Sequence, residues 1–156
     1  MAKRVRMIHL PASCEKRMKT ILGTEFPDFL NSLSSSVSHS IRINPGKIEK
    51  APILSSVPYC STGYYTKQRP IYTLDPLFHG GSYYVQESSS MFLEQFIRLT
   101  NRKNLRVLDL CAAPGGKSTH LSSLLTGESL LVSNDVIHSR ALILSENLKK
   151  RRCCCS

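Results

Sequence analysis

The stretch "VLDLCAAPGGKST" (residues 107–119) places a Gly-Gly-Lys loop between a short apolar run and a helical pattern. If Cys111 were a glycine, residues 111–118 would read G-x-x-x-x-G-K-S, the signature of a loop that wraps nucleoside triphosphates. Cys111, however, brings a Cβ to the position of the first glycine, and Pro114 has no N–H to donate to a phosphate. The Gly115-Gly116 pair still lets a ligand approach the backbone at a helix N-terminus. The stretch therefore predicts a ligand-binding loop that is a poor triphosphate site.

The segments on both sides of this loop predict the opening of a doubly wound α/β domain. "LRVLDL" (105–110) and "SLLVSND" (129–135) are short apolar runs without helical period, as expected of buried parallel strands. "KSTHLSSLLTG" (117–127) is expected to be a helix that ends at Gly127, and "SRALILSENLKK" (139–150) a second helix. The order strand, loop, helix, strand, helix is typical of the first half of a doubly wound sheet. Two strands with two helices would leave an open sheet edge and one uncovered flank.

The part before residue 100 has a mixed α+β texture. A helix is expected over residues 13–22, with Ser13 as its cap and Gly23 as its end, and a second near residues 28–33. "SIRIN" (40–44) and "SYYVQ" (82–86) predict strands, and "MFLEQFIRL" (91–99) predicts one helix. We therefore expect an N-terminal α+β domain over residues 1–100, a partial α/β domain over 101–150 and an atypical tail over 151–156.

The charge of the chain points to a polyanionic partner. Its 156 residues include 21 lysines and arginines against 11 acidic residues, a net charge of +10. A field of that sign attracts nucleic acid, so RNA is the expected partner, although a basic surface without a partner stays an open alternative. Three basic clusters stand out: Lys3, Arg4 and Arg6; Arg98, Arg102, Lys103 and Arg106; and Lys149 to Arg152.

The apolar runs do not indicate a membrane span, and the spacing of the cysteines does not indicate a zinc site. No apolar run approaches the roughly 18 residues that suggest a membrane span, and the first residues lack the apolar core of a signal peptide. The six cysteines contain no C-x-x-C pair with a second pair, so the sequence predicts no zinc site and favours reduced thiols. We expect a cytoplasmic protein.

Asp135 suggests which ligand the loop takes. It ends the second predicted strand, 19 positions after Gly116. In doubly wound nucleotide-binding folds, an acid about 20 residues beyond the glycine loop accepts hydrogen bonds from a ribose. S-adenosylmethionine has a ribose and no triphosphate, so it fits both observations, whereas NAD is disfavoured because no G-x-G-x-x-G is present. A helix N-cap is the structural alternative for Asp135.

At this point the sequence resembles the Sun/Fmu family of RNA cytosine-5 methyltransferases. "VLDLCAAPGGKSTHLSSLL" is similar to the family's first methyltransferase motif, and "YYVQESSSMFLEQFI" to the segment before it. "SIRIN" and "PYCSTGYY" resemble the N-terminal part of a bacterial ribosomal RNA enzyme of this family, and the likeness runs from Arg6 to Lys150. It implies a Rossmann-like domain that binds S-adenosylmethionine, with ribosomal RNA as the substrate. The cofactor-binding residues it implies are Cys111, Ala112, Ala113, Pro114, Gly115, Gly116, Lys117 and Asp135.

The family's chemistry, as the resemblance implies it, needs cysteines that we do not find in their places. In that chemistry a cysteine thiolate adds to C6 of cytosine. The family's cysteines lie in a Thr-Cys motif and a Pro-Cys-Ser-Gly motif, and both motifs follow the second helix of the domain. "PYCSTG" (58–63) precedes the loop instead, so we interpret Cys60 as a turn or core residue and assign no catalytic residue. We expect a truncated or frame-shifted end at the cysteines 153–155, with a metal-binding tail as the alternative. Such a chain would bind the cofactor weakly or not at all and transfer no methyl group alone. A non-catalytic RNA-binding protein and, less favoured, a nucleoside triphosphatase stay open as alternatives.

Overall fold

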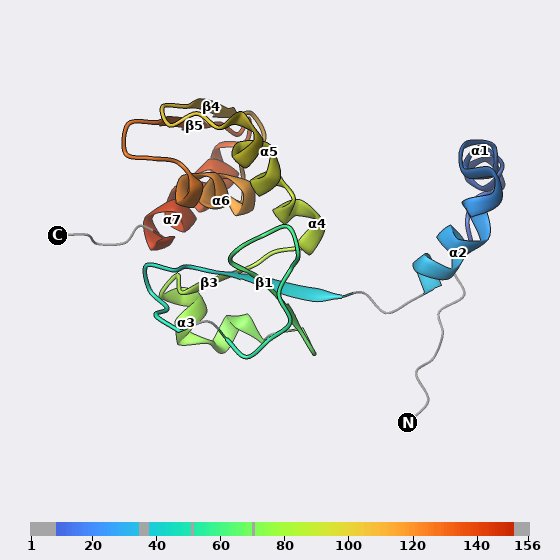
Figure 1. The fold of residues 1–156 in the computed structure, drawn as a ribbon, viewed down its shortest axis with the longest axis horizontal. Coiled ribbons are helices and arrows are strands. Elements are labelled where there is room, and N and C mark those ends of the chain that lie inside the picture. The colour runs from blue at the N-terminus through green and yellow to red at the C-terminus, as the bar shows by residue number, and fades with distance from the viewer. Residues whose placement is uncertain (1–8, 35–37, 51, 70, 152–156) are drawn as a thin grey trace. The chain divides into compact units, whose positions relative to one another are not determined.

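The computed structural model describes residues 9–34, 38–50, 52–69 and 71–151 (Figure 1). The chain forms two compact units, residues 1–37 and 38–156. No helix among the described residues is long and apolar enough to cross a membrane.

The first unit is a pair of helices. Helix α1 (Ala12–Leu22) is followed by the 3-10 turn η1 (Gly23–Glu25) and by α2 (Phe26–Ser34). The predicted end at Gly23 is confirmed, because its N–H donates to the carbonyl of Lys19. The predicted cap at Ser13 is wrong: the helix already includes Ala12, it follows Pro11, and no side chain caps it.

The second unit begins with a three-stranded antiparallel sheet. Strand β1 (His39–Ile43) lies between β2 (Gly63–Thr66) and β3 (Tyr83–Val85), in the order β2-β1-β3. Both strands predicted from "SIRIN" and "SYYVQ" are therefore confirmed. Between β2 and β3 lie the 3-10 turn η2 (Tyr72–Leu74) and the short helix α3 (Pro76–His79), whose first turn is capped by Asp75.

Two short helices connect this sheet to the rest of the unit. The single helix predicted over residues 91–99 is in fact α4 (Ser88–Met91) and α5 (Leu93–Thr100), which meet at Phe92. Met91 is fully buried against Val57 and Cys60, whereas Phe92 and Phe96 remain largely exposed. The apolar side chains of this segment thus only partly face the core.

The predicted strand–helix–strand–helix order is confirmed. Strand β4 (Arg106–Asp109) leads to α6 (Gly116–Leu124), and β5 (Leu130–Ser133) leads to α7 (His138–Arg151). The strands are parallel, with Val107 beside Leu131 and Leu108 beside Val132. Helix α6 ends at Leu124, before the expected Gly127, because Leu125 already has an extended backbone.

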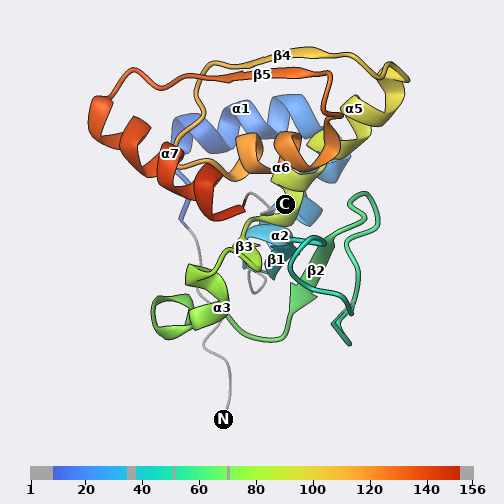
Figure 2. The ribbon, with the colours of Figure 1, turned by 90° about the vertical axis from the view of Figure 1, so that its left-hand side faces the viewer.

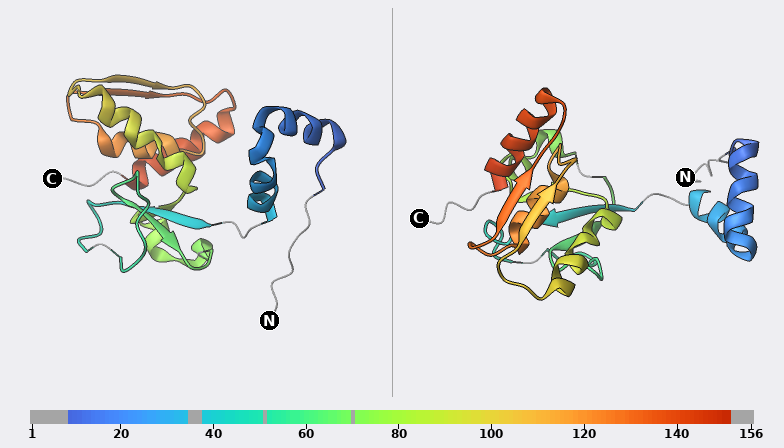
Figure 3. Two further views of the ribbon diagram at one scale, coloured as in Figure 1. Left: turned by 45° about the vertical axis from the view of Figure 1, so that its right-hand side comes forward. Right: turned by 90° about the horizontal axis from the view of Figure 1, so that it is seen from above.

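Both helices lie on one face of the β4–β5 pair (Figures 2 and 3). On the opposite face no described element covers the sheet, and Leu108 is 59% and Val132 47% exposed. The expectation of buried strands is therefore wrong, since burial of a parallel sheet requires helices on both faces. The uncovered flank that the sequence predicted is present.

Arg42 joins the antiparallel sheet to α6. It is 0% exposed, and its Nε donates to Oε1 of Gln86 at 2.9 Å. Its Nη2 donates to Oγ1 of Thr119 at 2.7 Å and to the carbonyl of Gly116 at 3.2 Å. Burial, together with the charge of Arg151, lowers the pKa of Arg42 to about 9, so the guanidinium is charged at neutral pH.

The end of α7 is bound to the same sheet. The carbonyl of Lys150 accepts from Nζ of Lys47 at 2.6 Å, and the carbonyl of Arg151 accepts from Nδ2 of Asn44 at 3.0 Å. Gly81 permits this approach: its φ is +73°, and a Cβ built there would lie 2.1 Å from the oxygen of Lys150. The last turn of α7 therefore requires a glycine at position 81.

We expect Gly81→Ala to lower the free energy of unfolding by more than about 2 kcal/mol, because it adds both backbone strain and a clash with a carbonyl. Urea denaturation followed by circular dichroism measures this. Gly127→Ala is the matched control, since Gly127 has nothing within 4 Å of a built Cβ, and its effect should stay within about 0.5 kcal/mol. Equal effects of the two variants would contradict the packing of α7 on this sheet.

Candidate functional site

The loop between β4 and α6 is shaped by Gly115. This residue has a φ of +114° and precedes the first residue of α6. A Cβ at this position would lie 3.3 Å from Cδ1 of Leu144 and 3.5 Å from Cβ of Asn147, both on α7. The backbone conformation and the close packing of α7 together require glycine here, which explains the first glycine of the Gly-Gly pair.

Polar contacts hold the ends of the two strands to α6. Oγ of Ser118 donates to Oδ2 of Asp109 at 2.7 Å, and Oγ of Ser133 donates to Oγ of Ser118 at 2.9 Å. The carboxylate at the end of β4 therefore fixes the first turn of α6 relative to both strands.

Asp135 holds the loop from the side of β5. Its Oδ2 accepts from the N–H of Ala113 at 3.3 Å and lies 3.4 Å from Nη2 of Arg140. Its Oδ1 accepts from the N–H of Ile137 at 3.1 Å, and only 4% of the side chain is exposed. Arg140 completes the contact by donating to the carbonyl of Ala113 at 2.8 Å. The structural role of Asp135 is thus to anchor the loop, and its role as a ribose acceptor stays a prediction.

A hollow of about 290 Å³ lies beside the loop. Six of the seven predicted loop residues line it: Cys111, Ala112, Ala113, Pro114, Gly116 and Lys117. Gly115 and Asp135 are not among the lining residues. The first N–H groups of a helix have no intrahelical partner, and at the N-terminus of α6 no side-chain hydrogen bond caps them.

The opposite wall of the hollow was not predicted residue by residue. It consists of residues that follow or end β3: Tyr84, Val85, Gln86, Glu87 and Ser90. They belong to "YYVQESSSMFLEQFI", whose resemblance to a family segment was the available signal. The spacing along the chain gave no indication that this segment faces the loop.

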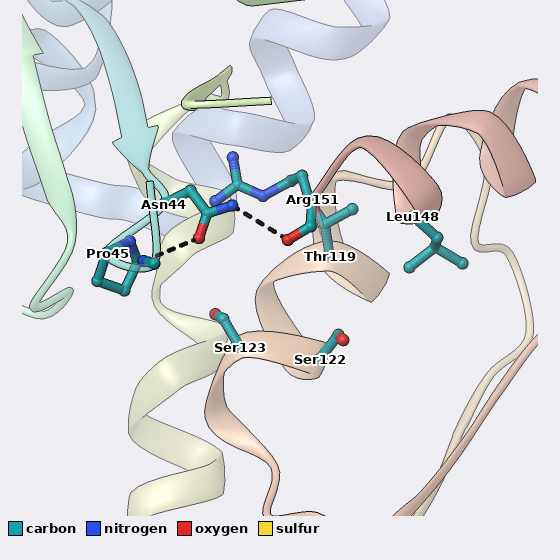
Figure 4. A pocket seen from close by; sticks show the side chains of 8 residues that line it. Asn44, Pro45, Thr119, Ser122, Ser123, Leu148 and Arg151 are labelled. Atoms are coloured by element: carbon teal, nitrogen blue, oxygen red, sulfur yellow. Dashed lines mark hydrogen bonds between the residues drawn. The ribbon is translucent and has the colours of Figure 1, made fainter. Parts of the chain in front are cut away.

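A second, polar hollow of about 300 Å³ lies where β1 meets the helices (Figure 4). Asn44 and Arg151 form one end of it, and Ser122 and Ser123 of α6 form part of its wall. The Asn44 side chain is already engaged, because Oδ1 accepts from the N–H of Gly46 and Nδ2 donates to Arg151. None of the predicted site residues lines this hollow.

A buried cluster of Cys60, Glu94 and His120 lies apart from the loop. Nε2 of His120 is 3.2 Å from Oε2 of Glu94 and 3.7 Å from Sγ of Cys60. Burial would raise the pKa of Glu94, but hydrogen bonds from Arg98, Cys60 and Ser61 outweigh it and hold the pKa at about 2.

The other two members of the cluster are neutral at pH 7. Burial, with the charge of Arg42, lowers the pKa of His120 to about 4, and burial raises the pKa of the Cys60 thiol. The contact between His120 and Glu94 is therefore a hydrogen bond from a neutral imidazole. Because one imidazole nitrogen faces both the thiol and the carboxylate, these residues do not form a relay in which the acid orients the base through its second nitrogen.

The basic clusters have different environments. Arg98 pairs with Glu94, whereas Arg102, Lys103 and Arg106 are exposed around the start of β4. Of the C-terminal cluster, Lys149 is exposed and Arg151 contacts the carbonyl of Ile43. Lys3, Arg4 and Arg6 lie outside the described residues, as do Arg152 and the cysteines 153–155.

Two family models match most of the chain. Residues 10–88 match the N-terminal domain of 16S rRNA methyltransferase RsmF, and residues 96–154 match 16S rRNA methyltransferase RsmB/F. The ribosomal RNA small subunit methyltransferase F of Vibrio campbellii is 31% identical over 92% of the chain and 33% of its own length. That of Shewanella woodyi is 33% identical over 79% of the chain and 29% of its own length. The chain thus spans about a third of the length of these relatives.

Solved structures share the fold. "Crystal Structure of PH0851" matches with a TM-score of 0.74 and 27% identity over 90% of this chain and 34% of that one. NSun6 from Pyrococcus horikoshii, solved with SFG, matches with a TM-score of 0.69 and 17% identity over 90% of this chain and 62% of that one. At this identity the second likeness concerns the fold alone.

We expect Asp135→Ala to lower the free energy of unfolding by about 1–3 kcal/mol, because two backbone N–H groups and Arg140 lose their acceptor. Urea denaturation measures the loss. Glu128→Ala removes the same charge from an exposed position and should change stability by less than about 0.5 kcal/mol. If both variants behave alike, Asp135 does not anchor the loop.

Proposed function

The chain belongs to the RsmB/F family of 16S rRNA methyltransferases, and from this membership we propose that it serves S-adenosylmethionine-dependent methylation of cytosine C5 in RNA, with ribosomal RNA as the substrate. The observation that carries the proposal is the hollow beside residues 111–117, where six residues of the predicted cofactor loop share one surface. The chain spans about a third of the length of its relatives, so we also propose, from the resemblance, the reaction that the whole enzyme performs.

The residues of the hollow suit S-adenosylmethionine better than a triphosphate. Cys111 and Pro114 weaken a phosphate cradle, since the first carries a Cβ and the second has no N–H. The first turn of α6 presents N–H groups without a capping side chain, which suits the single carboxylate of the amino-acid end. Tyr84 and the Gln86 amide give the opposite wall an aromatic and a polar surface.

When bound, S-adenosylmethionine supplies an activated methyl group, and the residues of this chain would bind and orient it. In this proposal Cys111 to Lys117 contact the cofactor, and Asp135 holds the loop and accepts from the ribose. The proposed organisation is an RNA-contacting part over residues 1–100 and the beginning of a Rossmann-like methyltransferase domain over 101–150, working in the cytoplasm. The exposed basic residues Arg102, Lys103 and Arg106 support RNA as the partner.

We expect S-adenosylmethionine to bind to this chain at the loop, with a Kd weaker than about 0.1 mM. A hollow of about 290 Å³ is at the small end of ligand sites, so it encloses only part of this cofactor. Titration of the ¹⁵N-labelled chain followed by NMR should shift the amides of residues 111–117. ATP at equal concentration should shift them less.

Gly116→Val is the matched variant for this titration. Its backbone does not require glycine, and a built Cβ meets Tyr84 at 3.4 Å and Gln86 at 3.8 Å, both of which line the hollow, so a larger side chain at this position should narrow the hollow. The shifts caused by S-adenosylmethionine should weaken in this variant. Shifts that are larger with ATP, or that lie away from the loop, would contradict the proposal. Salt-dependent binding to 16S rRNA with no cofactor effect at all would favour the non-catalytic RNA-binding alternative.

A further inference from the structure

We propose that Cys60, Glu94 and His120 form a binding site for one Zn²⁺ ion. The three side chains come from the turn after β-bridge residue Ser56, from α5 and from α6, and all three residues are buried. One ligand atom from each, Sγ, a carboxylate oxygen and an imidazole nitrogen, lies within 4.8 Å of the other two. The site is separate from the loop at 111–117 and does not depend on the proposed methyltransferase function.

The spacing of the ligand atoms suits tetrahedral zinc. Bond lengths of about 2.3 Å to sulfur and about 2.0–2.1 Å to nitrogen and oxygen require separations of about 3.6 Å for sulfur and nitrogen and about 3.3 Å for nitrogen and oxygen. The observed separations are 3.7 Å from Sγ of Cys60 to Nε2 of His120 and 3.2 Å from that nitrogen to Oε2 of Glu94. Two of the three separations therefore already match a tetrahedral ion, and the third, from sulfur to the carboxylate oxygen, lies within 4.8 Å.

The charges of the cluster also favour a divalent ion. A thiolate and a carboxylate carry two negative charges and the imidazole is neutral, so the three ligands together balance Zn²⁺, and the buried Arg42 remains as the neighbouring positive charge. Thiolate and imidazole together select zinc over magnesium or calcium.

Contacts around the cluster hold the carboxylate in place. Oε1 of Glu94 accepts from Nε of Arg98 at 2.9 Å and from the N–H of Ser61 at 3.2 Å, while Oε2 points to His120. Such outer contacts orient a metal-binding carboxylate. Nδ1 of His120 is buried and has no hydrogen-bond partner among the described residues, so the outer contacts orient the carboxylate and not the imidazole.

A surface hollow gives the ion access. It has a volume of about 330 Å³ and is lined by residues 56–61, which include Cys60, and by Glu94, Gln95 and Arg98. A water molecule from this hollow can serve as the fourth ligand. Because the three protein ligands lie on a turn and two helices, zinc would fasten the turn at residues 58–62 to α5 and α6.

The test uses the full chain with the three tail cysteines replaced (Cys153→Ser, Cys154→Ser, Cys155→Ser), so that adjacent thiols do not compete for metal. After reduction and chelation, this parent is titrated with Co²⁺, whose bond to a thiolate absorbs in the near ultraviolet. We expect saturation at one ion per chain. Cys60→Ser should abolish the thiolate band and lower the affinity more than about 100-fold, while Cys14→Ser, at an exposed cysteine, should leave both unchanged.

Two further measurements keep the test decisive if Cys60→Ser fails to fold. X-ray absorption of the zinc-loaded parent should show one sulfur ligand with nitrogen or oxygen ligands completing the shell, and excess Zn²⁺ should raise the Tm of the parent by several degrees. No metal uptake, two or more sulfur ligands, or a thiolate band that survives in Cys60→Ser would each overturn the proposal and leave the cluster a hydrogen-bond network.

Discussion

The buried guanidinium of Arg42 is the constraint on which the second unit depends. It extends from the central strand of the antiparallel sheet and is bound by Gln86 beside β3 and by Gly116 and Thr119 in the first turn of α6. Nη1 of Arg42 is buried without a hydrogen-bond partner among the described residues, but the bonds of Nε and Nη2 reach both parts of the unit and so hold α6 against the sheet within the reach of one side chain. The hollow beside the loop lies between these same two parts, with one wall after β3 and the other at the start of α6. The shape of the candidate site is therefore a consequence of where Arg42 must be.

The local features of this unit could be predicted because they depend on neighbours in the chain. An apolar run, a Gly-Gly loop and a helical period were enough to predict β4 and α6. A second apolar run and a second helical period predicted β5 and α7. The sequence explained Gly115 by the approach of a ligand, whereas in the structure this glycine is required by its positive φ and by the packing of Leu144. The resemblance to the Sun/Fmu family added the identity of the loop, and the family matches confirm that membership.

Features that depend on contacts between distant residues could not be predicted. Cys60, Glu94 and His120 lie on three separate elements, and no short motif or period connects them, so the cluster emerges only from the packing of α5 and α6 on the turn. Asp135 was predicted from its position after a strand, yet its bonds to Ala113 and Ile137 depend on the exact path of the loop. The burial of β4 and β5 was overestimated for a related reason: apolar composition does not reveal whether one or both faces of a sheet are covered.

The bare face of the β4–β5 pair has a consequence for how the molecule behaves in concentrated solution. Leu108, Leu130 and Val132 form an exposed apolar patch beside the edges of the two-stranded sheet. Such a patch favours association between molecules of this chain. The net charge of +10 opposes such encounters by mutual repulsion. That repulsion is screened beyond about 8–10 Å at ordinary ionic strength, whereas the apolar attraction persists. Ionic strength is therefore the variable that sets the colloidal behaviour of this chain, and dilute buffers of low salt favour its dispersed form.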